Sequence, residues 1–167
     1  KIEKTGKYRV FITRTEDAFV PLGARVQFAR GHQASLFISI HADALRRREG
    51  DAQGATVYTL SERASDARAA RLAAAENQAD VIAGLDLAAQ EKDVAGILID
   101  LARRETKTFS LQFAQGMVTQ LKSTARLHQH PLKSAAFVVL KAPDVPSVLV
   151  ELGYVTNKAD LKSLISA

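Results

Sequence analysis

The stretch from Ser35 to Asp43 constrains the fold more than any other part of the sequence. It reads Ser-Leu-Phe-Ile-Ser-Ile-His-Ala-Asp, and its apolar residues do not alternate with polar ones as they would in a half-exposed strand. We therefore expect a central strand covered on both faces, in a parallel or mixed sheet packed with helices. Ligands of such sheets bind outside the carboxyl ends of the strands, and His41 lies at that end.

His41 alone has two interpretations. A lone histidine at a strand end is more typical of a side chain bonded to a backbone carbonyl than of a metal ligand. Asp43 follows two residues later, so in extended chain both side chains point to one side and Asp43 can orient the imidazole. A functional role for His41 therefore requires a partner elsewhere in the chain.

A second covered strand, expected at 145–150, leads directly into Glu151. If the two strands run parallel in one sheet, His41 and Glu151 emerge at the same edge. Burial beyond an apolar strand raises the pKa of a carboxyl group and suits it to proton transfer near neutral pH. The pair is the start of a hydrolytic zinc site, in which His41 binds the metal and Glu151 takes a proton from the bound water. Catalytic zinc has three protein ligands, and the residue pattern alone does not supply all three.

Composition limits the remaining possibilities. The chain of 167 residues is 47% hydrophobic, which is enough for one domain with a real core. It has no cysteine, so a metal site must use His, Asp or Glu. No run of about 18 apolar residues occurs, so we expect no membrane span.

The net charge of +5 is unevenly distributed. Residues 76–105 hold seven acidic and three basic residues, whereas the rest of the chain is strongly basic. A basic body favours an anionic partner such as cell-wall polymer, nucleic acid or a membrane surface. Nucleic acid is the weaker option, because aromatic residues make up 6% of the chain and there is no Trp for stacking. No Gly-x-Ser-x-Gly elbow supports a serine hydrolase.

The other elements follow from periodicity, capping residues and breakers. We expect further strands at 8–13, 54–60 and 137–140 and helices at 21–30, 61–80, 94–104 and 108–121, with a short terminal helix. Ser61 is the expected N-cap of the helix at 61–80. The His-Gln-His-Pro run at 128–131 is interpreted as a polar linker and not as a metal site.

Five motifs, in this order, resemble the zinc-dependent N-acetylmuramoyl-L-alanine amidases of the cell-division type, known as amidase family 3. They are Thr-Arg-Thr-Glu-Asp at 13–17, Pro-Leu-Gly-Ala-Arg at 21–25, the His41 strand at 35–43, Gly-Ala-Thr-Val-Tyr at 54–58, and Val-Leu-Val-Glu-Leu-Gly-Tyr-Val-Thr-Asn at 148–157. The resemblance implies one α/β catalytic domain over 1–167, with a mixed, mostly parallel central sheet flanked by helices. It also implies hydrolysis of the amide between N-acetylmuramic acid and L-alanine in peptidoglycan.

The family's motifs assign roles to particular residues. The resemblance implies that His41 is a Zn²⁺ ligand and that Glu151 is the catalytic carboxylate. The family's other two zinc ligands, a His in a Gly-His-Gly-Gly loop and a Glu in the first helix, have no counterpart in this chain. The chain is therefore expected to be incomplete at both ends and, by itself, inactive or metal-free. Arg14 and Arg25 are candidates for contacting glycan or stem-peptide carboxylates, although structural salt bridges are the commoner role.

The resemblance also implies regulation. The segment 61–107 resembles an inserted helical segment that covers the site until a partner, an activator protein with a LytM domain, removes it. Glu76 resembles the insert's carboxylate that fills the open position of zinc, and a solvated helix residue is the equal alternative. The implied location is the periplasm, in daughter-cell separation. A noncatalytic wall-binding module with the same fold is the alternative function.

Overall fold

The computed structural model describes residues 2–45, 52–84 and 97–166. Four strands form one mixed sheet in the order β1-β4-β2-β3, listed by bounds as β1 Phe37–Asp43, β2 Ala55–Leu60, β3 Leu127–Ala135 and β4 Ser147–Tyr154. β1 pairs with β4 and β2 with β3 in parallel, while β2 and β4 are antiparallel. The expected mixed, mostly parallel sheet flanked by helices is confirmed.

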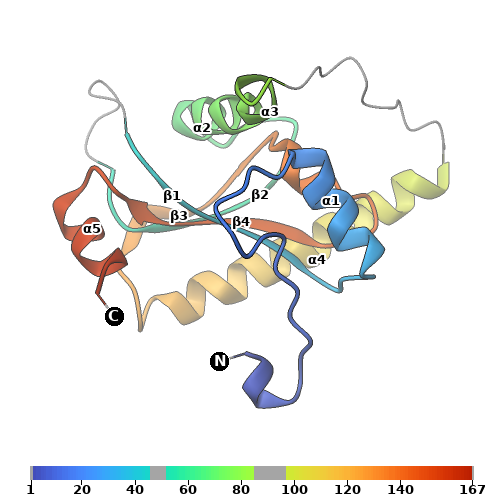
Figure 1. The fold of residues 1–167 in the computed structure, drawn as a ribbon, viewed down its shortest axis with the longest axis horizontal. Coiled ribbons are helices and arrows are strands. Elements are labelled where there is room, and N and C mark those ends of the chain that lie inside the picture. The colour runs from blue at the N-terminus through green and yellow to red at the C-terminus, as the bar shows by residue number, and fades with distance from the viewer. Residues whose placement is uncertain (1, 46–51, 85–96, 167) are drawn as a thin grey trace.

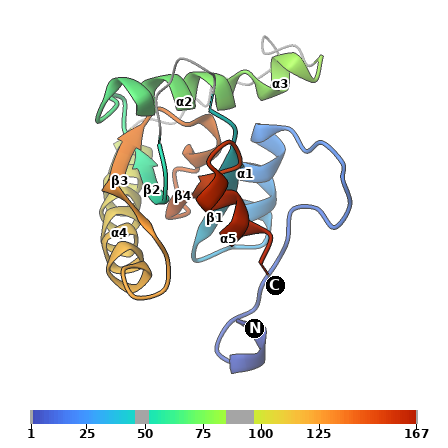
Figure 2. The same cartoon turned by 90° about the vertical axis from the view of Figure 1, so that its left-hand side faces the viewer.

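Helices cover both faces of this sheet (Figure 1). The long helix α4, Ile97–Leu121, packs Ala114 and Val118 against Val57, Val148 and Val150. On the opposite face lie α1, Leu22–Gly31, and α2, Ala67–Asn77. Figure 2 shows α4 and α1 on either side of the strands, with α2 crossing above them.

The face opposite α4 holds the larger core. Tyr58 and Leu149 from the sheet are buried there with Phe137 and Leu140, and the rings of Tyr58 and Phe137 meet edge to face at 5.4 Å. Alternation along the strands explains the two cores, because Val57 and Tyr58 are neighbours and point to opposite faces. The 3-10 helices η1, Glu3–Thr5, and η3, Val138–Leu140, and the short helices α3, Ala79–Ile82, and α5, Lys158–Leu164, complete the described elements.

Three of the strand predictions are wrong in part or in whole. The His41 strand was expected to be central and covered on both faces, but β1 is at an edge of the described sheet and Ile40 is 68% exposed. Residues 8–13 form no strand, and Phe11 and Ile12 are 47% and 67% exposed. Among the described residues no neighbouring strand pairs with this segment. A high β propensity without a pairing strand does not produce a sheet. The segment expected as a strand at 137–140 is instead η3, and the strand β3 precedes it. β3 includes the His-Gln-His-Pro run interpreted as a linker, and Pro131 fits there because β3 is at the edge of the described sheet.

The helix predictions differ from the structure in their boundaries. The helices expected at 94–104 and 108–121 are one continuous α4, because the polar residues between them include no Gly or Pro that would break it. The helix expected at 61–80 begins later, where the Asp66 side chain, and not Ser61, accepts a hydrogen bond from the Ala69 amide at 2.8 Å. The helical insert over 61–107 stays a prediction, and residues 85–96 lie outside the described residues.

The described helices include none that is both long enough and apolar enough to cross a membrane.

Gly54 makes the entry into β2 possible. Its φ is +80°, and a Cβ at this position would lie 2.6 Å from the backbone carbon of Leu127. We expect Gly54→Ala to lower the free energy of unfolding by about 3 kcal/mol, because both the backbone angle and the close approach oppose a side chain. Urea unfolding measures this change. Gly116→Ala in α4, where nothing lies within 4 Å of the new Cβ, is the control and should gain up to about 1 kcal/mol.

Candidate functional site

The parallel pairing of β1 with β4 brings His41 and Glu151 together. The two residues are direct partners in the register. Neighbouring residues in register on adjacent strands point to the same face of a sheet. Both strands continue past the residue that the sequence suggested as their end, so His41 and Glu151 lie within the sheet and not beyond it. Their proximity is as expected; their catalytic roles stay predictions.

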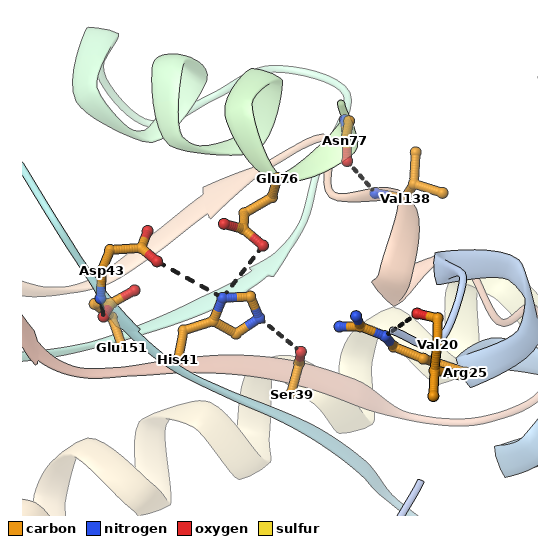
Figure 3. Close-up of polar contacts among 9 residues, drawn as sticks. All are labelled: Val20, Arg25, Ser39, His41, Asp43, Glu76, Asn77, Val138 and Glu151. Atoms are coloured by element: carbon orange, nitrogen blue, oxygen red, sulfur yellow. Dashed lines mark hydrogen bonds and ion pairs between the residues drawn. The ribbon is translucent and has the colours of Figure 1, made fainter. Parts of the chain in front are cut away.

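His41 is held by contacts on both ring nitrogens (Figure 3). Nε2 lies 2.9 Å from Ser39 Oγ, and Nδ1 lies 3.3 Å from Glu76 Oε2 and 4.0 Å from Asp43 Oδ1. Burial lowers the pKa of His41, opposed by the Asp43 charge and reinforced by the Arg25 charge. A lowered pKa keeps the imidazole neutral near pH 7, which is the form that binds a metal.

Glu151 is a fully buried carboxyl group in the middle of the sheet. Its Oε1 accepts a hydrogen bond from the Asp43 amide at 2.8 Å, and within the described part of the chain its buried Oε2 has no hydrogen-bond partner. Burial, reinforced by the charges of Asp43 and Glu76 and opposed by the hydrogen bond from the Asp43 amide, raises the pKa of Glu151 to about 8. A carboxyl group with such a pKa can exchange protons near neutral pH, as a general base must.

Glu76 reaches the site from the last turn of α2. Its side chain is 23% exposed and contacts His41, so the solvated alternative does not describe it. Burial raises the pKa of Glu76, and the positive charge of Arg25 opposes the shift. Figure 3 shows the Glu76 carboxylate above the His41 ring, on the same side as Asp43.

His41, Asp43 and Glu76 form a candidate metal site. Each offers one ligand atom, and these atoms all lie within 4.8 Å of one another. One imidazole nitrogen and two carboxylate oxygens suit zinc and several other divalent cations. The sequence interpretation gave Asp43 a supporting role; here its carboxylate belongs to the same cluster as His41.

The two candidate arginines differ in position. Arg25 Nε donates to Val20 O at 2.8 Å, and its charge acts on both His41 and Glu76. Arg14 is exposed and donates to Ala18 O at 2.7 Å. Neither guanidinium forms an ion pair within 4 Å among the described residues. Arg25 therefore lies at the edge of the site, where burial lowers its pKa and the charge of Arg14 lowers it further.

Sequence reasoning missed three residues near the site. Ser39 contacts the imidazole of His41, and Asn77 and Asp80 join α2 and α3 to the rest of the protein. Ser39 could have been found from alternation, because it precedes His41 by two residues and shares its face. The signal for Asn77 and Asp80 was the polar run that begins at Glu76, which was interpreted for Glu76 alone.

A family model described as N-acetylmuramoyl-L-alanine amidase matches residues 1–167. The chain therefore belongs to the N-acetylmuramoyl-L-alanine amidase family, as the sequence motifs indicated. It is 37% identical to the amidase AmiC of Escherichia coli O6:H1 over 167 residues, and 41% identical to AmiA of Escherichia coli K12 over 157 residues. It covers 39% and 54% of the lengths of these two relatives.

Solved structures agree with this assignment. AmiC2 of Nostoc punctiforme has a TM-score of 0.56 at 25% identity, over 99% of this chain and 66% of that chain. An amidase of Clostridium difficile 630 has a TM-score of 0.59 over 98% of this chain and 66% of that chain. At 19% identity, the second likeness concerns the fold alone.

The burial of Glu151 makes stability depend on pH. Because the folded pKa lies near 8 and the ordinary value is 4.5, the folded state binds the proton more tightly, so stability should fall as pH rises between these values. Glu151→Gln, which cannot ionise, should not show this loss. Relative to the variant, the natural chain should lose about 3 kcal/mol of unfolding free energy between pH 5 and pH 8. Urea unfolding with a chelator present measures it; parallel pH dependences would contradict it.

Proposed function

We propose that the protein containing this chain is a peptidoglycan hydrolase that cleaves the amide between N-acetylmuramic acid and L-alanine. The observation that carries the proposal is the register pairing of His41 with Glu151, beside a cluster of possible metal ligands. Membership of the family supports the choice of substrate. A zinc hydrolase needs a metal ligand and a general base close together, and these two residues satisfy that geometry.

We propose zinc as the cofactor, held by His41 together with further ligands. The nitrogen of His41 and the oxygen of Asp43 fit it, Glu76 adding a ligand only while the lid is closed, and the chain has no cysteine that would favour a thiolate site. When bound, zinc lowers the pKa of water and polarises a carbonyl group. Asp43 has two possible contributions to this site: its carboxylate lies near the His41 ring, and its amide holds one oxygen of Glu151.

Glu151 serves as the general base and then as the general acid. It accepts a proton from the attacking water and passes it to the amine that leaves with the stem peptide. The bond from the Asp43 amide fixes the direction of the carboxyl group, and burial keeps its pKa close to the pH of the reaction. Arg25, at the edge of the site, is suited to contact a carboxylate of the stem peptide.

We further propose that α2 and α3, residues 67–82 and hereafter the lid, inhibit the enzyme. The lid lies over the sheet beside the site, and Glu76 projects from it onto His41 at 3.3 Å. In the proposed inhibited state this carboxylate would fill the open position of zinc, as the resemblance to the family implies. An activator protein, of the LytM-domain type, would displace the lid in the periplasm during daughter-cell separation.

Activity and metal content test the catalytic proposal on the full-length protein. We expect elemental analysis to find about one zinc per molecule and purified peptidoglycan to release stem peptides. Glu151→Gln should lower the release rate at least about 100-fold while zinc is retained, because it removes the general base and keeps the shape. Retained hydrolysis in this variant would remove Glu151 from its role. A zinc-free protein that binds peptidoglycan would favour a noncatalytic wall-binding module.

Basal activity tests the inhibitory role of Glu76. Without activator, we expect Glu76→Ala to raise the release of stem peptides about tenfold or more, because it removes the carboxylate that contacts His41. Deleting residues 76–105 should raise it as well. Glu62→Ala, which changes an exposed acidic residue before the lid, is the matched control. An unchanged or lower rate in the folded Glu76 variant would count against inhibition by this residue.

A further inference from the structure

Two residues of the lid form hydrogen bonds with the body of the protein without touching the site. We propose that Asn77 and Asp80 form a latch that holds the lid closed, separately from the blocking contact of Glu76, and that an activator must release this latch. The inference rests on the proposed inhibitory role of the lid. In this proposal Glu76 blocks the site, whereas Asn77 and Asp80 hold the lid in its closed position.

Asn77, the last residue of α2, binds the backbone between β3 and η3 with both ends of its amide. Nδ2 donates to Ala136 O at 2.8 Å. Oδ1 accepts from Val138 N at 2.8 Å, a bond that Figure 3 shows. The Asn77 side chain thus forms hydrogen bonds with a backbone carbonyl and a backbone amide of the same segment, as the backbone of a neighbouring strand would. A partly buried backbone group that loses such a partner is costly unless water replaces it.

Asp80 makes the second connection, to the start of α1. Its side chain is 2% exposed, and Oδ1 accepts a hydrogen bond from the Leu22 amide at 2.9 Å. Leu22 is the first residue of α1, and the residue before it is Pro21, which makes no capping bond from its side chain. A carboxylate from the lid therefore satisfies one of the amides that a helix leaves free at its start. The positive end of the helix dipole favours a negative charge at this position.

The two ends of the lid are attached differently. At its beginning, Asp66 caps α2 and pairs with the buried Lys133 at 3.1 Å, directly after the chain leaves β2. This end is fixed to the sheet and suits a hinge. At its other end, the polar attachments to described residues include those of Asn77, Asp80 and the Glu76–His41 contact. Releasing the Asn77 and Asp80 bonds would free the end that carries Glu76.

The latch predicts faster opening when either attachment is removed. In the full-length protein without activator, Asn77→Leu and Asp80→Ala should each raise the opening equilibrium of the lid about tenfold, as the loss of a partly or fully buried hydrogen-bonded partner does. Hydrogen–deuterium exchange of residues 67–82 should accelerate by the same factor. Release of stem peptides should rise with it.

Conservative and neighbouring variants provide the controls. Asp80→Asn keeps an oxygen that can accept from Leu22 and should stay near the natural rate of exchange. Gln78→Ala lies between the two latch residues, at an exposed position whose side chain makes no capping bond, and should change little. Asn77→Asp keeps the acceptor for Val138 but loses the donor to Ala136, so it tests the latch if Asn77→Leu does not fold. Thermal unfolding verifies that each variant is folded.

The two readouts separate the latch from the function on which it rests. The latch would be overturned if exchange were unchanged both in Asp80→Ala and in Asn77→Leu. If Asn77→Leu does not fold, Asn77→Asp takes its place in this test. Equal acceleration of exchange in Gln78→Ala would also overturn the latch. Accelerated exchange without a rise in hydrolysis would keep the latch and refute inhibition by the lid. Glu76→Ala should raise hydrolysis with a smaller change in exchange than a latch variant, because Asn77 and Asp80 still hold the lid.

Discussion

The site depends on the register between β1 and β4. Because His41 is the direct partner of Glu151, the imidazole and the carboxyl group share one face of the sheet at adjacent positions. A slip of one residue in either strand would turn one of the two side chains to the opposite face, toward α4. The apolar residues that fix the register, such as Val148 and Val150 packed on α4, therefore hold the chemistry in place without touching it.

The same register places a carboxyl group in the interior. Glu151 is 0% exposed, between β1 on one side and β2 on the other, where Thr56 is its partner. A buried carboxyl group with one hydrogen-bond donor costs stability. Proteins retain such groups where the raised pKa is useful, and functional sites are where perturbed pKa values gather. The position of Glu151 is therefore better explained by proton transfer than by folding.

Much of this arrangement could be predicted from the sequence, and the failures have physical causes. The strands of His41 and Glu151 were recognisable because continuous apolar runs ending on ionisable residues are unusual. β3 was missed because its polar, proline-containing sequence is that of an edge strand, which has few apolar neighbours to reveal it. Residues 8–13 were misassigned because β-branched and aromatic residues indicate a strand only when another strand is available. The contacts of Asn77 and Asp80 join segments about 60 residues apart, so the polar run that contains these residues does not reveal their partners.

The lid has an electrostatic effect as well as a steric one. In the closed arrangement Glu76 brings a third carboxyl group to the pair formed by Asp43 and Glu151, and its charge raises the pKa of Glu151 further. A general base is inactive while it holds a proton, so under the proposed mechanism lid closure would both cover His41 and favour the protonated form of Glu151. Removal of Glu76 lowers the pKa of Glu151 toward the value at which the base is ionised. Opening of the lid would therefore both expose the His41 imidazole and favour the ionised form of Glu151.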